Sequence, residues 1–225
     1  MGRPKNDTTK YEILRCATEL FLEKGYTDAY VTTIAKTLGI STGLLTFWFP
    51  TKEHILAELV RELFAFQWES EKEETDSLTE YLYELAMIAS VCEENPKARD
   101  LILAVYTHAQ SIEIVRRYDT KRSQQTFKAY CGQWTEKDFV IAENAASGVE
   151  RAMLVTANTE GITFEERVSG SLDAIMKIYD VPSEERKPIL ANVMASDYRT
   201  RGNHVFEEFC RFVGSKIMQR RKAKR

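Results

Sequence analysis

Apolar side chains recur at helical spacing along almost the whole of this 225-residue chain. In residues 9–24, for example, Ile13, Leu14, Ala17 and Phe21 fall on one face of a helix. No alternation of apolar and polar residues is long enough to indicate a strand. We therefore predict an all-α fold, with a long helix from residue 51 and further helices over residues 9–24, 31–38, 41–48, 78–94, 97–109, 111–133, 136–158, 164–179, 184–196 and 204–221.

Local signals mark several of the predicted helix ends. Gly39 follows the second helix, where a glycine can adopt the left-handed conformation that ends helices. Thr163 and Glu166 have the spacing of a capping box, and residues 135–138 resemble one with Asp138 in place of Glu. The dipeptides at 95–96 and 181–182 contain proline and predict breaks.

Several functional classes lack their usual signatures. No apolar run approaches the ~18 residues of a membrane span, and the N-terminus lacks the apolar segment of a signal peptide. We therefore expect a cytoplasmic protein. The scattered cysteines (Cys16, Cys92, Cys131 and Cys210) predict reduced core thiols and no metal site. Without a nucleophile elbow, a phosphate loop or a paired-carboxylate motif, we expect no enzyme and no cofactor.

The most informative stretch is residues 31–49, where two short helical segments flank a turn centred on Gly39. This pattern predicts a helix-turn-helix, whose second helix can enter a major groove of DNA. Spacing alone leaves simple packing as the alternative. The predicted small core of the motif consists of Ile34, Ala35, Leu38, Ile40, Leu44 and Leu45.

Residues 10–60 carry further residues at fixed spacing around this motif. They include Leu20-Phe21 before Lys24-Gly25-Tyr26, then Ile34-Ala35, Leu38-Gly39-Ile40-Ser41 and Gly43, and finally Phe49-Pro50 before Lys52-Glu53 and Ile55-Leu56. This pattern resembles the N-terminal domain of the tetracycline-repressor (TetR) family. The chain departs from that family at Tyr30, at Thr42 and at Thr46-Phe47-Trp48-Phe49, which bears on base preference.

The resemblance implies that the chain binds double-stranded DNA. Phe47 is suited to contact a thymine methyl group, with packing inside its own domain as the alternative. Lys52 matches a family lysine that contacts the DNA backbone, although a lysine is also commonly just solvated. The predicted DNA-contacting residues, with Leu44 counted here as well as in the core, are Thr32, Thr33, Ser41, Thr42, Gly43, Leu44, Thr46, Phe47, Trp48 and Lys52.

The domain division follows from this assignment and from the charge. The net charge is −3, yet residues 1–54 carry seven basic and six acidic side chains, and residues 216–225 carry six basic and none acidic. The negative charge therefore lies between them, in a body that repels DNA. We predict a helix-turn-helix domain over 1–54, a helical regulatory and dimerisation domain over 55–221 and a basic tail over 222–225, which is either solvated or adds nonspecific attraction to DNA.

The resemblance also implies a homodimer and a ligand cavity in the body. The candidate dimer helices are 139–158 and 164–179, with 204–221 as the alternative. The first presents the small residues Ala145, Gly148 and Ala152, and the second presents Val168, Leu172, Ile175, Met176 and Tyr179. Aromatic side chains with polar tips suit a mostly apolar pocket, although aromatic residues at helical spacing are more often ordinary core residues. The candidate ligand-contacting residues are Phe64, Trp68, Tyr83, Met87, Tyr106, His108, Phe127 and Tyr130.

Together these features predict a ligand-responsive dimeric repressor. It would bind an inverted-repeat operator and leave it when a small apolar or amphipathic ligand tilts the helix that starts at residue 51. Two alternatives stay open. One is a DNA-binding factor controlled by a protein partner, and the other is an all-helical enzyme with an incidental helix-turn-helix.

Overall fold

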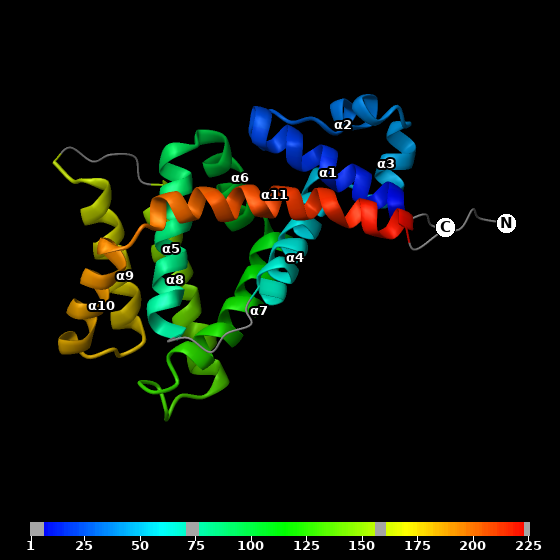
Figure 1. The fold of residues 1–225 in the computed structure, drawn as a ribbon. Helices are drawn as coiled ribbons and strands as arrows, with labels where there is room; N and C mark the ends of the chain where they lie inside the picture. Colours follow the sequence, from blue (N-terminus) through cyan, green and yellow to red (C-terminus); the bar gives the residue numbers. More distant parts are fainter. Residues whose placement is uncertain (1–6, 71–76, 156–160, 223–225) are drawn as a thin grey trace. The chain divides into compact units, whose positions relative to one another are not determined.

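The computed structural model describes residues 7–70, 77–155 and 161–222 of the chain. Every regular element in these ranges is a helix, which confirms the predicted all-α class. Figure 1 follows the helices in chain order: α1 (Asp7–Lys24), α2 (Val31–Leu38), α3 (Thr42–Trp48), α4 (Lys52–Ser70), α5 (Ser77–Glu94), α6 (Pro96–Thr107), α7 (Ala109–Thr126), α8 (Glu136–Val155), α9 (Phe164–Ile178), α10 (Ser183–Ala195) and α11 (Tyr198–Lys222).

These helices form two compact units. The first comprises Met1–Glu71, Pro96–Ser111 and Val205–Arg225, and the second comprises Lys72–Asn95 and Ile112–His204. Helices α7 and α11 therefore contribute residues to both units. The predicted boundary between a DNA-binding domain and a regulatory domain at residues 54 and 55 stays a prediction. It does not coincide with a boundary between the compact units, because the first unit continues to Glu71.

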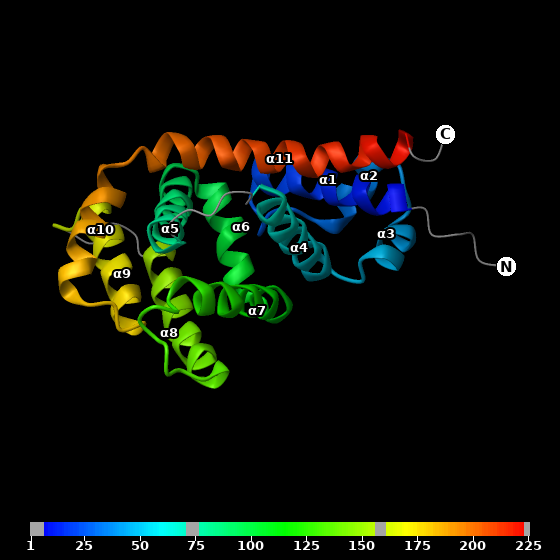
Figure 2. The ribbon, with the colours of Figure 1, turned by 60° about the horizontal axis from the view of Figure 1, so that its bottom comes forward.

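The core of the first unit is built mainly from α1 and α4. Ile13, Phe21, Ile55 and Leu56 are fully buried there, as the helical spacing of their segments indicated. Leu101 and Ala104 of α6 and Phe209 of α11 join the same cluster. In Figure 2 the C-terminal part of α11 lies alongside α1. The helix-turn-helix is thus completed by segments that follow it by 40 residues and more in the chain.

In the second unit, α9 packs against α8, α10 and α5. Its start agrees with the predicted capping box: Thr163 Oγ1 accepts from the Glu166 backbone N–H (3.1 Å), and the Glu166 carboxylate accepts from Thr163 N–H (2.8 Å). At the start of α8 the Asp138 carboxylate likewise accepts from Thr135 N–H (2.8 Å). Both predictions were correct because a capping box involves residues only three apart.

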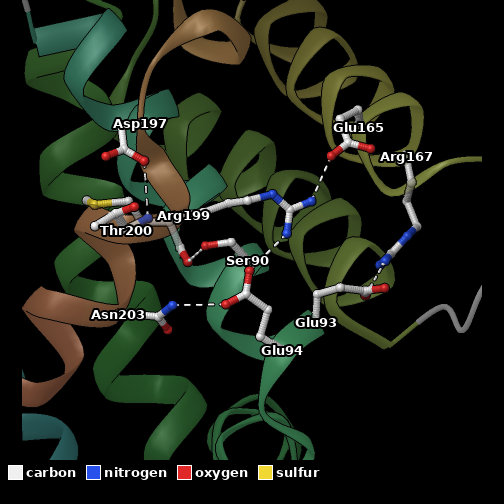
Figure 3. A network of polar contacts seen from close by, with 10 residues as sticks. Ser90, Glu93, Glu94, Glu165, Arg167, Asp197, Arg199, Thr200 and Asn203 are labelled. Carbon is white, nitrogen blue, oxygen red and sulfur yellow. Dashed lines mark hydrogen bonds and ion pairs between the residues drawn. The ribbon is translucent and has the colours of Figure 1, made fainter.

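Helix α11 begins earlier than predicted, at Tyr198 instead of residue 204. Its first turns are fastened by Arg199, which donates to Glu94 (3.0 Å) and Glu165 (2.7 Å), and by Asn203, which donates to Glu94 (2.9 Å; Figure 3). Gly202, which precedes the predicted start of this helix, lies inside it. A Cβ at this position would meet the Met87 carbonyl oxygen at 2.9 Å, so the glycine permits close packing against α5.

Helix α7 ends at Thr126, seven residues before the predicted end. Residues 127–134 form turns instead, in which Phe127 and Cys131 are buried. The Phe127 ring stacks on that of Tyr179, with centroids 4.0 Å apart. Burial of these side chains therefore prevails over continuation of the helix.

Two further expectations concern cysteines and membranes. Cys16, Cys92 and Cys131 are buried thiols, whereas the side chain of Cys210 lies outside the described residues. Over the described ranges, none of the helices combines the length and the apolar character needed to cross a bilayer.

Candidate nucleic-acid interface

The turn of the helix-turn-helix depends on Gly39, which adopts φ 64° and ψ 27°. In this left-handed conformation Gly39 N–H donates to the Lys36 carbonyl (3.1 Å), and Ile40 N–H donates to the Ala35 carbonyl (3.0 Å). These bonds end α2, and α3 begins at Thr42, three residues after Gly39. Ser41 caps α3, because its side-chain oxygen accepts from Leu44 N–H (3.1 Å).

The inner face of the motif is narrower than predicted. Ile34, Ala35 and Leu45 are buried as expected, and Phe49 joins them. Leu44, which the sequence placed in the core, is 41 % exposed, so its assignment to the core was wrong. Leu45 is the buried residue of α3.

The outer face of α3 is exposed and carries no charge. Thr42, Gly43 and Thr46 are exposed, and Phe47 is 61 % exposed, an unusual state for a phenylalanine. Trp48 is half-buried, and its ring meets that of Phe47 edge-on at 5.9 Å. This face combines hydroxyl groups and apolar edges, which can read base edges and thymine methyl groups in a major groove.

On α2, Thr32 is exposed and Thr33 is half-buried. No side chain caps the N-terminus of α2, because Tyr30 occupies the cap position, and no acidic residue lies in its first turn. An uncapped helix N-terminus presents amide N–H groups that suit a phosphate. Lys36, in the last turn of α2, is exposed as well and was not among the predicted contacts. Its place beside the turn was the signal that could have suggested it.

Lys52 has structural partners that the sequence did not reveal. Its Nζ donates to the carbonyl oxygens of Tyr26 (2.8 Å) and Thr27 (3.3 Å) and lies 4.3 Å from the centroid of the Tyr26 ring. Burial lowers the pKa of the Lys52 ammonium, and nearby carboxylates partly offset this. The phosphate contact stays a prediction, and it requires Lys52 to exchange carbonyl oxygens for a phosphate oxygen.

The same turn is held from α6 by Asp100. Its carboxylate accepts from Thr27 N–H and from Thr27 Oγ1, each at 2.8 Å. Lys97, also on α6, donates to the Glu23 carbonyl. The ring of His108 lies 5.3 Å from that of Tyr26. No sequence signal could have indicated these contacts, since Asp100 and Thr27 are 73 residues apart.

The candidate ligand-contacting residues divide between the two units. Phe64, Trp68, Tyr106 and His108 belong to the first, although the side chain of Trp68 lies outside the described residues. Tyr83, Met87, Phe127 and Tyr130 belong to the second. There Tyr83 donates to the Asp197 carbonyl (3.3 Å) and Tyr130 to Glu185 (2.7 Å), while Phe127 is fully buried. Their role in ligand binding stays a prediction.

The comparison with known proteins agrees with this geometry. Residues 13–59, which span α1 to the first half of α4, match the family described as bacterial regulatory proteins, tetR family. Residues 13–59 are therefore a DNA-binding domain of the TetR family. Members of the TetR family are transcription regulators that bind DNA through this domain, and the helix-turn-helix described above is its DNA-binding part.

A solved TetR family structure extends the likeness of fold beyond the N-terminal domain. CprB from S. coelicolor A3(2) superimposes with a TM-score of 0.51 and 18 % sequence identity, covering 84 % of this chain and 98 % of CprB. At this identity the likeness concerns the fold alone. No curated protein sequence matches the chain.

Proposed function

We propose that this TetR-family protein is a cytoplasmic, homodimeric repressor that reads an inverted-repeat operator and is released by a small molecule. The observation that carries the DNA-binding part is the outer face of α3, where Phe47 and Leu44 stay exposed beside Thr42 and Thr46. Exposure of these apolar side chains to water is unfavourable in free energy for the protein without DNA. Contact with a groove removes that cost.

The phosphate contacts must come from the flanks of the motif, because α3 has no charged residue. We assign them to Lys36 and to the uncapped N-terminus of α2, with Lys52 joining when it leaves its carbonyl partners. Such contacts position the protein on the duplex, whereas base-edge contacts provide sequence preference. The two groups therefore respond differently to mutation.

The test begins by sequencing the genomic fragments that the purified protein retains. On the site so identified, Phe47→Ala should weaken binding by about 5- to 150-fold, which corresponds to the loss of one base contact of ~1–3 kcal/mol. Lys36→Ala should weaken all DNA alike and flatten the salt dependence by about one unit of log–log slope. Ile162→Ala is the control, because Ile162 is an exposed apolar residue outside the motif. Parental binding by both motif variants would contradict the proposal.

The dimer proposal is supported by the surface of α8. Ile141, Ala145, Gly148 and Ala152 follow helical spacing along one face and are all exposed. Small residues allow close approach of a second helix. The apolar residues predicted for the partner helix α9, including Leu172 and Ile175, are buried within their own unit and are not available to a partner. The α9 side of the interface is instead assigned to the face that bears the exposed Gly170.

Sedimentation measurements test this assignment. A carboxylate introduced by Ala145→Glu should convert a dimer into monomers, whereas Lys137→Glu, at an exposed position near the start of the same helix, should leave the dimer intact. A dimer should also protect two half-sites about 34–36 Å apart, or a multiple of that distance. A parental chain that sediments as a monomer at micromolar concentration would contradict the dimer.

Release by a ligand was predicted to act through α4. The described contacts add α6 to that prediction, because α6 holds the turn at residues 25–27 through Asp100 and packs Leu101 into the core of the motif. A ligand that favours one arrangement of these helices would lower operator affinity by about 5- to 150-fold, for a typical coupling of ~1–3 kcal/mol. Operator DNA must then weaken ligand binding by the same factor.

A further inference from the structure

The second unit buries a group of carboxylates that come from α7 and α8. Glu143 and Glu150, seven residues apart on α8, are 1 % and 2 % exposed. Each accepts a hydrogen bond from a tyrosine: Tyr179 donates to Glu143 Oε2 (2.9 Å), and Tyr81 donates to Glu150 Oε1 (3.0 Å). Asp119 of α7 is close enough for both glutamates to raise its pKa, in addition to the larger effect of burial.

Two buried polar atoms in this group lack a hydrogen-bond partner within the described part of the chain. They are the second carboxylate oxygen of Glu143, Oε1, and the guanidinium Nε of Arg116. Arg116 attracts Glu143 electrostatically but does not satisfy Oε1. Leaving a buried acceptor unsatisfied is unfavourable, more so when it is charged. Among the described residues no donor satisfies Glu143 Oε1, although Arg116 acts on Glu143 and Arg122 on Asp119 electrostatically, so Oε1 can accept a hydrogen bond from a ligand.

Aromatic rings surround the same carboxylates. Tyr179 stacks on Phe127 with centroids 4.0 Å apart, and the Tyr81 ring meets Phe127 edge-on at 5.7 Å. The ring centroids of Trp134 and Phe139 also lie near that of Tyr179, at 6.0 Å and 6.4 Å. Trp134 is half-exposed, so the ring cluster reaches the surface of this unit. Aromatic faces attract cations and also accommodate apolar chains.

A metal ion does not fit this site. Among the described residues, no three histidine, cysteine, aspartate or glutamate side chains converge closely enough to hold one. An organic ammonium ion matches the chemistry of these groups, because its N–H groups can donate to Glu143 Oε1 and its carbon chain can pack against aromatic rings. An alcohol with the same carbon chain would supply a hydrogen-bond donor without the positive charge.

We propose that Glu143, Glu150 and Asp119, with the rings of Tyr81, Phe127, Trp134 and Tyr179, form a binding site for an organic ammonium cation. This inference rests on the function proposed above, in which a small molecule releases the repressor, and it names the chemical class of that molecule. Glu143 Oε1 accepts the N–H donor, the Glu143 carboxylate balances the charge of the ligand after it releases its proton, and the rings hold the apolar part.

The proposal can be tested by calorimetry on the full-length protein without DNA. The probes are n-alkylammonium chlorides from butyl to decyl, each compared with the alcohol of the same chain length. At least one ammonium should bind saturably, and its alcohol should bind at least about tenfold more weakly, since charge-assisted hydrogen bonds are roughly twice as strong as neutral ones. This comparison uses the parental protein and needs no variant.

Proton release provides a second, independent readout. Burial and the neighbouring Glu150 raise the pKa of Glu143 to about 8, whereas Tyr179 and Arg116 act in the opposite direction. Glu143 is therefore mostly protonated at neutral pH and must release its proton when an ammonium binds. Titrations in two buffers of different ionisation enthalpy should show release of up to about one proton per site. Glu143→Gln should abolish the release and weaken binding, whereas Glu136→Gln, an exposed carboxylate on the same helix, should change neither.

The outcomes separate this site from the proposed function. Failure of every ammonium to bind, equal binding of ammonium and alcohol, or unchanged binding by Glu143→Gln would each overturn the site. Operator affinity is then measured with and without the bound ammonium. A bound ammonium that leaves operator affinity unchanged supports the site and contradicts ligand release, whereas a protein that retains no DNA contradicts the repressor and leaves the ammonium result standing.

Discussion

Replacement of Asp100 by asparagine should loosen the turn at residues 25–27 and lower the stability of the first unit. In the parental protein the Asp100 carboxylate accepts two hydrogen bonds from Thr27, both at 2.8 Å. The same turn supplies the carbonyl oxygens that Lys52 binds. Asparagine keeps one acceptor oxygen, loses the negative charge and places an NH2 group where the second oxygen was. One hydrogen bond is thus lost and the other is weakened.

The expected magnitude follows from those two bonds. Hydrogen bonds to charged groups contribute about 1.5–3 kcal/mol each, and the low end applies because Thr27 is exposed and water competes. We therefore expect Asp100→Asn to lower the free energy of unfolding by about 1–2 kcal/mol. For a chain of this length, each kcal/mol corresponds to roughly 2–4 °C in Tm, so the decrease should be about 2–8 °C.

Urea denaturation followed by circular dichroism measures this loss. The matched control is Asp28→Asn, which removes the same charge one residue after Thr27, where the aspartate side chain is exposed. Asp28→Asn should stay within about 0.5 kcal/mol of the parental protein, as is usual for surface substitutions. Equal losses in the two variants, or no loss in Asp100→Asn, would refute the assignment of a stabilising contact between α6 and the turn.

Three further predictions concern single positions. Gly39→Ala should lower the free energy of unfolding by about 1–2 kcal/mol, because φ is 64° and an added Cβ would meet no atom within 4 Å, so the cost is wholly conformational. The control Gly43→Ala, inside α3, should not destabilise the protein. An equal loss in both variants would contradict this explanation. Thr163→Ala should cost about 0.5–2 kcal/mol by removing the cap of α9, and a loss below about 0.3 kcal/mol in thermal unfolding would show that the capping box contributes little. The pKa of Glu143 is raised to about 8 from 4.5, so between these pH values the native state holds a proton that the unfolded state has released. The free energy of unfolding should therefore fall as pH rises from 4.5 towards 8, by up to about 1.4 kcal/mol per pH unit from this group. In urea denaturation, Glu143→Gln should show a shallower pH dependence than the parental protein.

Features that depend on residues close together in the chain could be predicted from the sequence. The all-α class followed from apolar periodicity, and the turn at Gly39 and the capping box at Thr163 followed from residues within four positions of each other. The TetR-like N-terminal domain was predictable for the same reason, since its motif occupies a contiguous segment. Local hydrogen bonds and short-range packing decide such features, and both are visible as spacing in a sequence.

Only the tertiary structure decided which side chains lose their contact with water and which distant groups they meet. The sequence marked Leu44 as apolar, yet Leu45 alone fills the buried position on α3. It marked Lys52 as basic, yet carbonyl oxygens of the preceding turn occupy its ammonium. No signal in the sequence indicated that Glu143 and Glu150 are buried, because the tyrosine hydroxyls that they bind come from other segments of the chain. Such contacts join residues dozens of positions apart, and their formation depends on how the helices pack rather than on any local pattern.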